Sequence, residues 1–235
     1  MIKEALKYIV GLGETQTLNF DGDNYTNREI YRVEGPLAQA ITTTTLTSIV
    51  DYIKNNVDDN KMSDRNLLIH IKSPNTVVLE SDLNKDRKRE TYIVAEALTP
   101  DINFDRFMDA ERFNIMLQSS FVEKKDRSIV LKVAGNIQDS AVKTYGDDGT
   151  SQTVSIKAGV ASIADVVVPN PVYLSPYRTF PEVEQPDSRF IFRMKEGAQC
   201  ALFEADGGAW RNVAMDSIKK YLEEQLQQYD VDIIS

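Results

Sequence analysis

Five of the eight prolines in this chain fall between Pro169 and Pro186, and they constrain its fold more than any other feature. Each proline ring fixes φ near about −65° and removes a backbone donor, so this stretch of backbone is stiff. Within a β-sheet, proline is tolerated mainly on edge strands. We therefore expect residues 166–174 to form an edge strand or an extended crossing.

Apolar residues at helical spacing predict about four helices. The clearest has Thr45 as a candidate N-cap and an apolar face made of Leu46, Ile49, Val50, Ile53 and Val57. The other three are expected at residues 2–10, 105–121 and 212–228. Gly11 or Gly13 can end the first of them.

Alternating apolar runs, separated by turn sequences, predict antiparallel hairpins between the helices. A further hairpin is expected within residues 15–34. Strands are expected at residues 67–71, 76–80, 91–97, 128–134, 141–145, 152–160, 190–194 and 201–204. The mixed order of helices and hairpins favours an α+β fold, in which antiparallel sheets pack with helices, over a doubly wound parallel sheet.

The predicted elements form two cycles, each a helix followed by strands. These cycles suggest two similar α+β lobes, residues 1–100 and 101–235. Neither an internal repeat nor a low-complexity linker separates them, so a single intimate domain remains the alternative. With 235 residues and 42% hydrophobic content, the chain can build a core without disulfides or metals.

The chain is acidic, with 27 Lys and Arg against 36 Asp and Glu and a formal net charge of −9. This average charge repels duplex DNA and anionic membranes, so neither is the expected partner. Cys200 is the only cysteine, which rules out an intrachain disulfide. No apolar run is as long as a signal-peptide core or a membrane span. We expect a cytoplasmic protein.

Several short motifs fit ordinary structure better than a ligand site. Gly11-Leu-Gly13 lacks the third glycine and the preceding strand of a dinucleotide loop, and is interpreted as a helix C-cap. Asp21–Asn24 lacks the ligands and glycine of a calcium loop. His70, the only histidine, alternates with apolar residues in a strand, and the basic run 85–89 fits a solvated loop. We expect no cofactor, no metal site and no catalytic residue.

The candidate ligand site has two parts. In the first, Tyr177-Arg178-Thr179-Phe180, an arginine between aromatic residues on stiff backbone suits capture of a phosphate or carboxylate beside a stacked ring. The second precedes the last predicted helix, whose N-terminus attracts anions and whose Gly-Gly turn lets a ligand approach the backbone. It contributes Glu204, Asp206, Trp210 and Arg211.

The same residues also have a purely structural interpretation. Trp210 can anchor a core, and Arg178 and Glu204 can form an internal ion pair. If Glu204 and Asp206 lie on one strand, their spacing points both carboxylates to the same side, as a hydrolase would need. No nucleophile or metal-ligand set accompanies them, so an enzyme is the least favoured function.

Four runs occur in order towards the end of the chain: DDGTSQTVSIKAGVA, VPNPVYLSPYRTFPEVEQP, RFIFRM and CALFEADGGAWR. In this series the chain resembles the YfdQ-like family of uncharacterised phage and prophage proteins, over residues 40–228. The resemblance implies a phage or prophage origin and activity in the cytoplasm of a bacterial host. It carries no catalytic residues that could be transferred to this chain.

The favoured function is therefore a non-enzymatic binding protein that sequesters a small, nucleotide-derived anionic ligand, such as a bacterial immune signal. Sequestration needs affinity and abundance rather than acid–base chemistry, and a symmetric homo-oligomer would multiply the sites. The alternative is a phage protein–protein interaction module that inhibits or redirects a host or phage factor. Its acidic surface would complement a basic partner or mimic nucleic acid.

Overall fold

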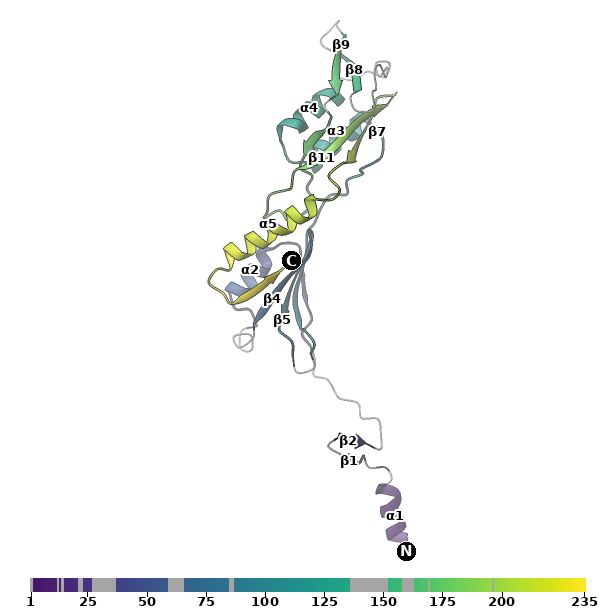
Figure 1. Cartoon of the computed structure of the whole chain (residues 1–235), viewed down its shortest axis with the longest axis vertical. Helices are drawn as coiled ribbons and strands as arrows, with labels where there is room; N and C mark the ends of the chain where they lie inside the picture. The colour runs from purple at the N-terminus through teal and green to yellow at the C-terminus, as the bar shows by residue number, and fades with distance from the viewer. Residues whose placement is uncertain are drawn as a thin grey trace. The chain divides into compact units, whose positions relative to one another are not determined.

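Contacts divide the protein into two compact units, Met1–Leu37 and Ala38–Ser235 (Figure 1). The boundary lies after Leu37, whereas the sequence suggested lobes of residues 1–100 and 101–235. The structure is a computed structural model that describes residues 2–11, 13, 15–20, 23–26, 37–58, 66–84, 87–135, 152–157, 163–168, 170–195 and 197–235.

The first unit contains the predicted N-terminal helix and hairpin. Helix α1 (Ile2–Gly11) ends where the glycines predicted, and the Gly13 N–H donates to the Val10 carbonyl at 2.9 Å. Strands β1 (Thr17–Phe20) and β2 (Asp23–Thr26) pair antiparallel; the turn between them lies outside the described residues. No residue of α1 is buried, and its largest apolar side chains are exposed.

The first sheet of the second unit has the strand order β13-β4-β5-β6-β3. Its strands are β3 (Ile41–Thr43), β4 (Leu67–Ser73), β5 (Thr76–Ser81), β6 (Thr91–Glu96) and β13 (Val231–Ile234). The three central strands are antiparallel, as predicted, whereas β3 and β13 join the edges in parallel. The sheet therefore combines strands that lie far apart in the sequence.

Helices α2 (Thr47–Lys54) and α5 (Trp210–Gln225) cover one face of this sheet and bury a core that we call the first core. Its fully buried members include Ile49, Ile69, Ile218 and Leu222. The predicted N-cap of α2 is wrong: Leu46 occupies that position, and the Thr45 hydroxyl instead bonds the Ser48 hydroxyl at 2.8 Å.

The second sheet has the order β10-β11-β12-β7. Its strands are β10 (Val172–Leu174), β11 (Ser188–Lys195), β12 (Gln199–Glu204) and β7 (Met108–Asp109). Strand β10 lies at the sheet edge, as the prolines predicted, and β11 and β12 form the predicted hairpin. A separate hairpin pairs β8 (Gln152–Lys157) with β9 (Ile163–Val168).

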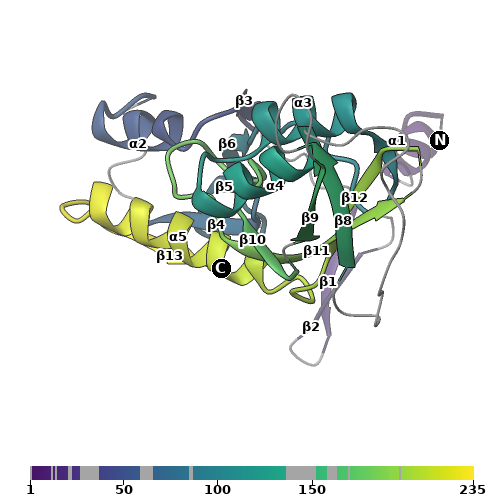
Figure 2. The ribbon, with the colours of Figure 1, turned by 90° about the horizontal axis from the view of Figure 1, so that it is seen from above.

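Helices α3 (Ala110–Ser120) and α4 (Lys125–Gly135) lie side by side against the second sheet and bury the second core (Figure 2). Aromatic rings dominate this core: Phe113 stacks on Phe192 with ring centroids 5.4 Å apart, and Phe121 meets Phe190 edge-on at 6.3 Å. The molecule is thus an α+β protein, as predicted.

Two predicted elements in this part of the chain are wrong. Residues 128–134, expected as a strand, belong to α4, because its buried residues repeat at helical spacing and Val130, Val133 and Ala134 pack in the second core. The helix expected from residue 105 begins only at Ala110, after β7. The strand expected at 141–145 lies outside the described residues.

The proline-rich segment contacts both cores. At one end, Pro176 forms a bridge with Phe121, and the Tyr177 N–H donates to the Ser120 carbonyl at 2.9 Å. Further on, Phe180 is fully buried in the first core, and the Thr179 hydroxyl donates to the Pro74 carbonyl. The stiff backbone therefore joins the two cores through residues 176–180.

Candidate functional site

The structure places Arg178 in an internal ion pair, which is the structural alternative that the sequence left open. Its Nη1 donates to Glu204 Oε1 at 2.6 Å, and its Nη2 donates to the Ser188 hydroxyl. The Arg178 side chain is only 9% exposed, and this burial lowers its pKa. The Glu204 carboxylate therefore neutralises the charge of Arg178 within the protein.

Trp210 and Arg211 complete a cluster around Arg178. The Arg178 guanidinium lies 3.8 Å from the centroid of the Trp210 ring, and that of Arg211 lies 4.9 Å from it. These are cation–π distances, so Trp210 helps to hold both cations. We call Arg178, Glu204, Asp206, Trp210 and Arg211 the Arg178 cluster.

Asp206 shapes the turn between β12 and α5. Its Oδ1 accepts the Gly208 N–H at 2.9 Å, and Gly208 has a φ of +81°, which glycine adopts without strain. A Cβ at Gly208 would also collide with the Arg211 guanidinium. Strand β12 ends at Glu204, so the carboxylates of Glu204 and Asp206 do not share a strand. The prediction that a common strand points both to the same side, as a hydrolase would need, is therefore wrong.

The remaining predicted residues separate from this cluster. Phe180 belongs to the first core and is fully buried, so a ligand cannot stack on it. Tyr177 is 41% exposed and lines a cavity of about 540 Å³, together with buried Thr179. We call this the tyrosine cavity; it is also lined by Leu98, Pro100, Ser119, Val122, Lys124, Pro181, Val183, Glu184 and Gln185.

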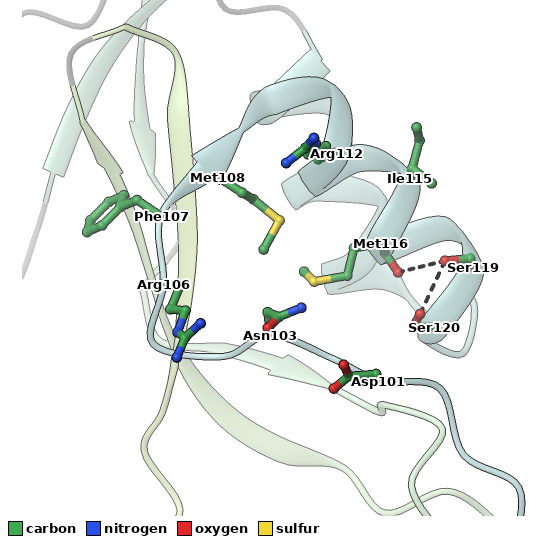
Figure 3. A pocket seen from close by; sticks show the side chains of 10 residues that line it. All are labelled: Asp101, Asn103, Arg106, Phe107, Met108, Arg112, Ile115, Met116, Ser119 and Ser120. Atoms are coloured by element: carbon green, nitrogen blue, oxygen red, sulfur yellow. Dashed lines mark hydrogen bonds between the residues drawn. The ribbon is translucent and has the colours of Figure 1, made fainter.

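A second cavity, of about 400 Å³, contains none of the predicted site residues (Figure 3). It lies between the loop that precedes β7 and one side of α3. We call it the arginine–methionine pocket; it is lined by Asp101, Asn103, Arg106, Phe107, Met108, Arg112, Ile115, Met116, Ser119 and Ser120. The sequence signal that could have found it is the pair of arginines on either side of a helix start.

The start of α3 positions one of these arginines. Asp109 is the N-cap, and its Oδ1 accepts the Arg112 N–H at 2.9 Å. The Arg112 Nε lies 3.6 Å from Asp109 Oδ2, but the Arg112 side chain is 82% exposed. A pair this exposed binds weakly, so Arg112 can exchange Asp109 for another anion at little cost.

The pocket interior is made of flexible apolar side chains beside polar groups. Figure 3 shows Met108 and Met116 pointing toward one another, with Asn103 beside Met116. Phe107 points away from the two methionines, and Lys195 Nζ lies 3.8 Å from the centroid of the Phe107 ring. The lining holds the guanidiniums of Arg106 and Arg112 and one carboxylate, Asp101. Thioethers adapt to flat rings, and guanidiniums bind phosphates or carboxylates.

The other motifs occupy ordinary structural positions. His70 lies half-buried in β4, and Cys200 is fully buried in β12. Burial, with the nearby charge of Asp109, raises the pKa of Cys200 to about 12, so its thiol stays protonated. In the basic run, Arg89 Nη1 donates to the Ser81 carbonyl at 2.7 Å, while residues 85–86 lie outside the described part.

Among the described residues, no three His, Cys, Asp or Glu side chains gather where they could hold a metal ion. None of the described helices is both long and apolar enough to cross a membrane. No protein-family model matches this chain, and no curated protein or solved structure matches it significantly. The resemblance to the YfdQ-like family therefore stays a prediction.

Proposed function

We propose that this protein binds and holds a small anionic ligand with a ring system, without converting it, and that the arginine–methionine pocket is the site. The observation that carries the proposal is the placement of Arg106 and Arg112 on one cavity with Met108 and Met116. The cation predicted for this role, Arg178, is already paired with Glu204.

The size and charge of the pocket support this proposal. Its volume of about 400 Å³ falls within the range of about 300–1,000 Å³ typical of small-molecule sites. Its lining carries two cations against one carboxylate, in a chain whose net charge is −9. Arg106 and Arg112 can therefore bind an anion here once Arg112 exchanges its exposed pair with Asp109.

The resemblance to phage and prophage proteins supplies a biological setting for the proposal. One ligand of this chemistry in an infected bacterial cytoplasm would be a nucleotide-derived immune signal, and its capture would blunt the host response. Homo-oligomers would multiply the sites per particle. Native mass spectrometry of the purified protein would report its oligomeric state and any retained ligand together.

The direct test is calorimetry with nucleoside monophosphates, cyclic dinucleotides and ADP-ribose. We expect Arg106→Ala and Arg112→Ala each to weaken binding roughly ten-fold or more, because each removes charge-assisted hydrogen bonds. Arg189→Ala is the matched control, since Arg189 is exposed on β11 and lies outside the pocket lining. Binding by none of these compounds, or equal losses in all three variants, would refute the proposal.

One substitution should act in the opposite direction. Asp109→Asn keeps a side-chain acceptor for the helix N-cap but removes the charge that competes for Arg112. Because exposed ion pairs contribute about 0.2–1 kcal/mol, we expect anion affinity to rise by about 1.4- to five-fold. The same titration should also show the ligand recovered unchanged, as sequestration requires.

Helix α1 favours the second candidate function, a protein–protein interaction module. Ile2 is 80% exposed and Tyr8 is 70% exposed, and Leu6 and Ile9 are more than half exposed. Amphipathic helices with such faces bind in apolar grooves of partner proteins. A tagged pull-down from infected cells should recover a stoichiometric partner that Leu6→Ser with Ile9→Ser abolishes and that Arg106→Ala retains. Recovery unchanged by the double substitution would exclude this function.

A further inference from the structure

We infer that the arginine–methionine pocket and the tyrosine cavity are the two ends of one site, built for a ligand with two ring systems. The inference rests on the proposed function and names the ligand class. Ser119, near the end of α3, lines both cavities. The chain that enters β7 also borders both, with Pro100 in the tyrosine cavity and Asp101 in the pocket.

Backbone hydrogen bonds hold the two linings together. The Tyr177 N–H donates to the Ser120 carbonyl at 2.9 Å, and the Val122 N–H donates to the Ser175 carbonyl at 2.9 Å. Tyr177 in one cavity is thus tied directly to Ser120 in the other. Proline stiffens the backbone at Pro176, so this geometry exists before a ligand arrives.

The two ends differ in chemistry. Cations in the arginine–methionine pocket are exposed, whereas Lys124 in the tyrosine cavity lies 2.7 Å from Asp187 Oδ1 and 3.7 Å from Glu184 Oε1. The tyrosine cavity therefore offers an exposed phenol ring and apolar residues rather than a free cation. Tyrosine faces stack bases regardless of base identity.

This order of groups fits a dinucleotide that carries a terminal phosphate. The terminal phosphate would contact Arg106 and Arg112, the first base would lie against Met116, and the second base would stack on Tyr177. Arg112 and Ser119 lie seven positions apart along α3, a rise of about 10 Å. A dinucleotide can place one base at each end of the site, whereas a mononucleotide has a single base and can stack at only one of them.

The test compares adenosine 5′-monophosphate with the linear dinucleotide pApA by calorimetry. We expect pApA to bind the unaltered protein roughly ten-fold or more tightly, because base stacking on tyrosine adds to its affinity. Tyr177→Ala should remove this advantage and leave the affinity for the monophosphate unchanged, whereas Tyr177→Phe should retain it. Tyr173→Ala is the matched control, since Tyr173 is 55% exposed on β10 and lies outside both linings.

The outcomes separate this inference from the proposed function. Equal affinities for the two compounds in the unaltered protein would overturn the two-ring site and leave the pocket standing. So would a Tyr177→Ala variant that still prefers pApA by the same factor. If neither compound binds the unaltered protein, the inference is rejected and the proposed function is weakened. If both compounds bind the unaltered protein but neither binds Arg106→Ala, the shared site is supported.

Discussion

Arg127 is a buried cation that closes the end of helix α3. Its Nε donates to the Leu117 carbonyl at 2.8 Å, and its Nη2 donates to the Gln118 carbonyl at 3.0 Å. The last carbonyls of a helix lack partners within the helix and carry partial negative charge. Arg127 therefore satisfies two acceptors that would otherwise be buried without donors.

Replacing this side chain should be costly. We expect Arg127→Ala to lower the free energy of unfolding by about 3 kcal/mol, because it removes two charge-assisted hydrogen bonds and leaves their acceptors unpaired. Urea denaturation measures this change. Arg127→Lys can keep one of the two hydrogen bonds, so its free energy of unfolding should lie between those of Arg127→Ala and the unaltered protein. A loss below about 0.5 kcal/mol, the range of ordinary surface substitutions, would contradict this account.

Asp206 makes a pH-dependent contribution to stability. Burial alone would raise its pKa, but hydrogen bonds from Gly208 and Ser188 and the charge of Arg178 together lower it below the ordinary value of 3.8. A carboxylate whose pKa is lowered by folding stabilises the protein fully above its unfolded pKa. That contribution disappears as the pH falls through the lower folded pKa.

Asp206→Asn should therefore reduce the urea midpoint at neutral pH. Its effect should shrink as the pH falls from 3.8, the pKa of the unfolded side chain, through the lower pKa at which the folded protein takes up the proton. Parallel urea titrations of the two proteins across this range measure the difference. A gap in midpoint that does not narrow with acidity would show that the carboxylate charge is not the source of the effect.

Among the elements, the strongly patterned ones were predictable from sequence. Helix α5 and the β4–β5 and β11–β12 hairpins follow their periodicity and turn residues. Strands β3 and β13 have three and four residues, too few to show a period. Helix α4 was mistaken for a strand because Ile129, Val130 and Val133 favour strands by propensity, which helical burial overrides.

A single exposed residue can test whether 125–135 is helical. Ser128 is exposed within α4, and alanine is favoured over serine in helices but disfavoured in strands. We expect Ser128→Ala to raise the free energy of unfolding by about 0.5 kcal/mol. Ser128→Gly should lower it by a similar amount. A decrease with alanine would indicate a strand.

The candidate site was only partly predictable. The proline-rich segment drew attention to Tyr177 and Thr179, which line a cavity, and to Arg178, whose charge is paired with Glu204. The arginine–methionine pocket was missed because its lining combines an irregular loop with one side of α3. Such a combination depends on tertiary packing, which no local pattern encodes.

At the scale of the whole second unit, Phe180 couples the two cores. It is fully buried in the first core, while Pro176, four residues earlier, pairs with Phe121 of the second. Phe180→Ala should cost about 3–5 kcal/mol, as expected for a buried aromatic residue. Because the connection is stiff, we expect the loss to appear as one shifted unfolding transition of both cores.

Two probes together can check this coupling. Fluorescence of Trp210, the only tryptophan, reports the Arg178 cluster, and far-ultraviolet circular dichroism reports all helices. Their urea transitions should coincide in both the unaltered protein and Phe180→Ala. Phe104 stacks on Phe190 of the second core, so Phe104→Ala serves as a control that perturbs the protein from that core. Transitions that separate would show that each core unfolds by itself.

The parallel pairing of β13 with β4 has a consequence for synthesis on the ribosome. Strand β4 ends at Ser73, but its parallel partner β13 begins only at Val231, so the first sheet stays incomplete while the intervening chain is made. At about 5–20 residues per second, that wait is on the order of ten seconds. The described members of the second core all lie within residues 102–202 and are made earlier, so the segment translated later is expected to fold before the one translated first.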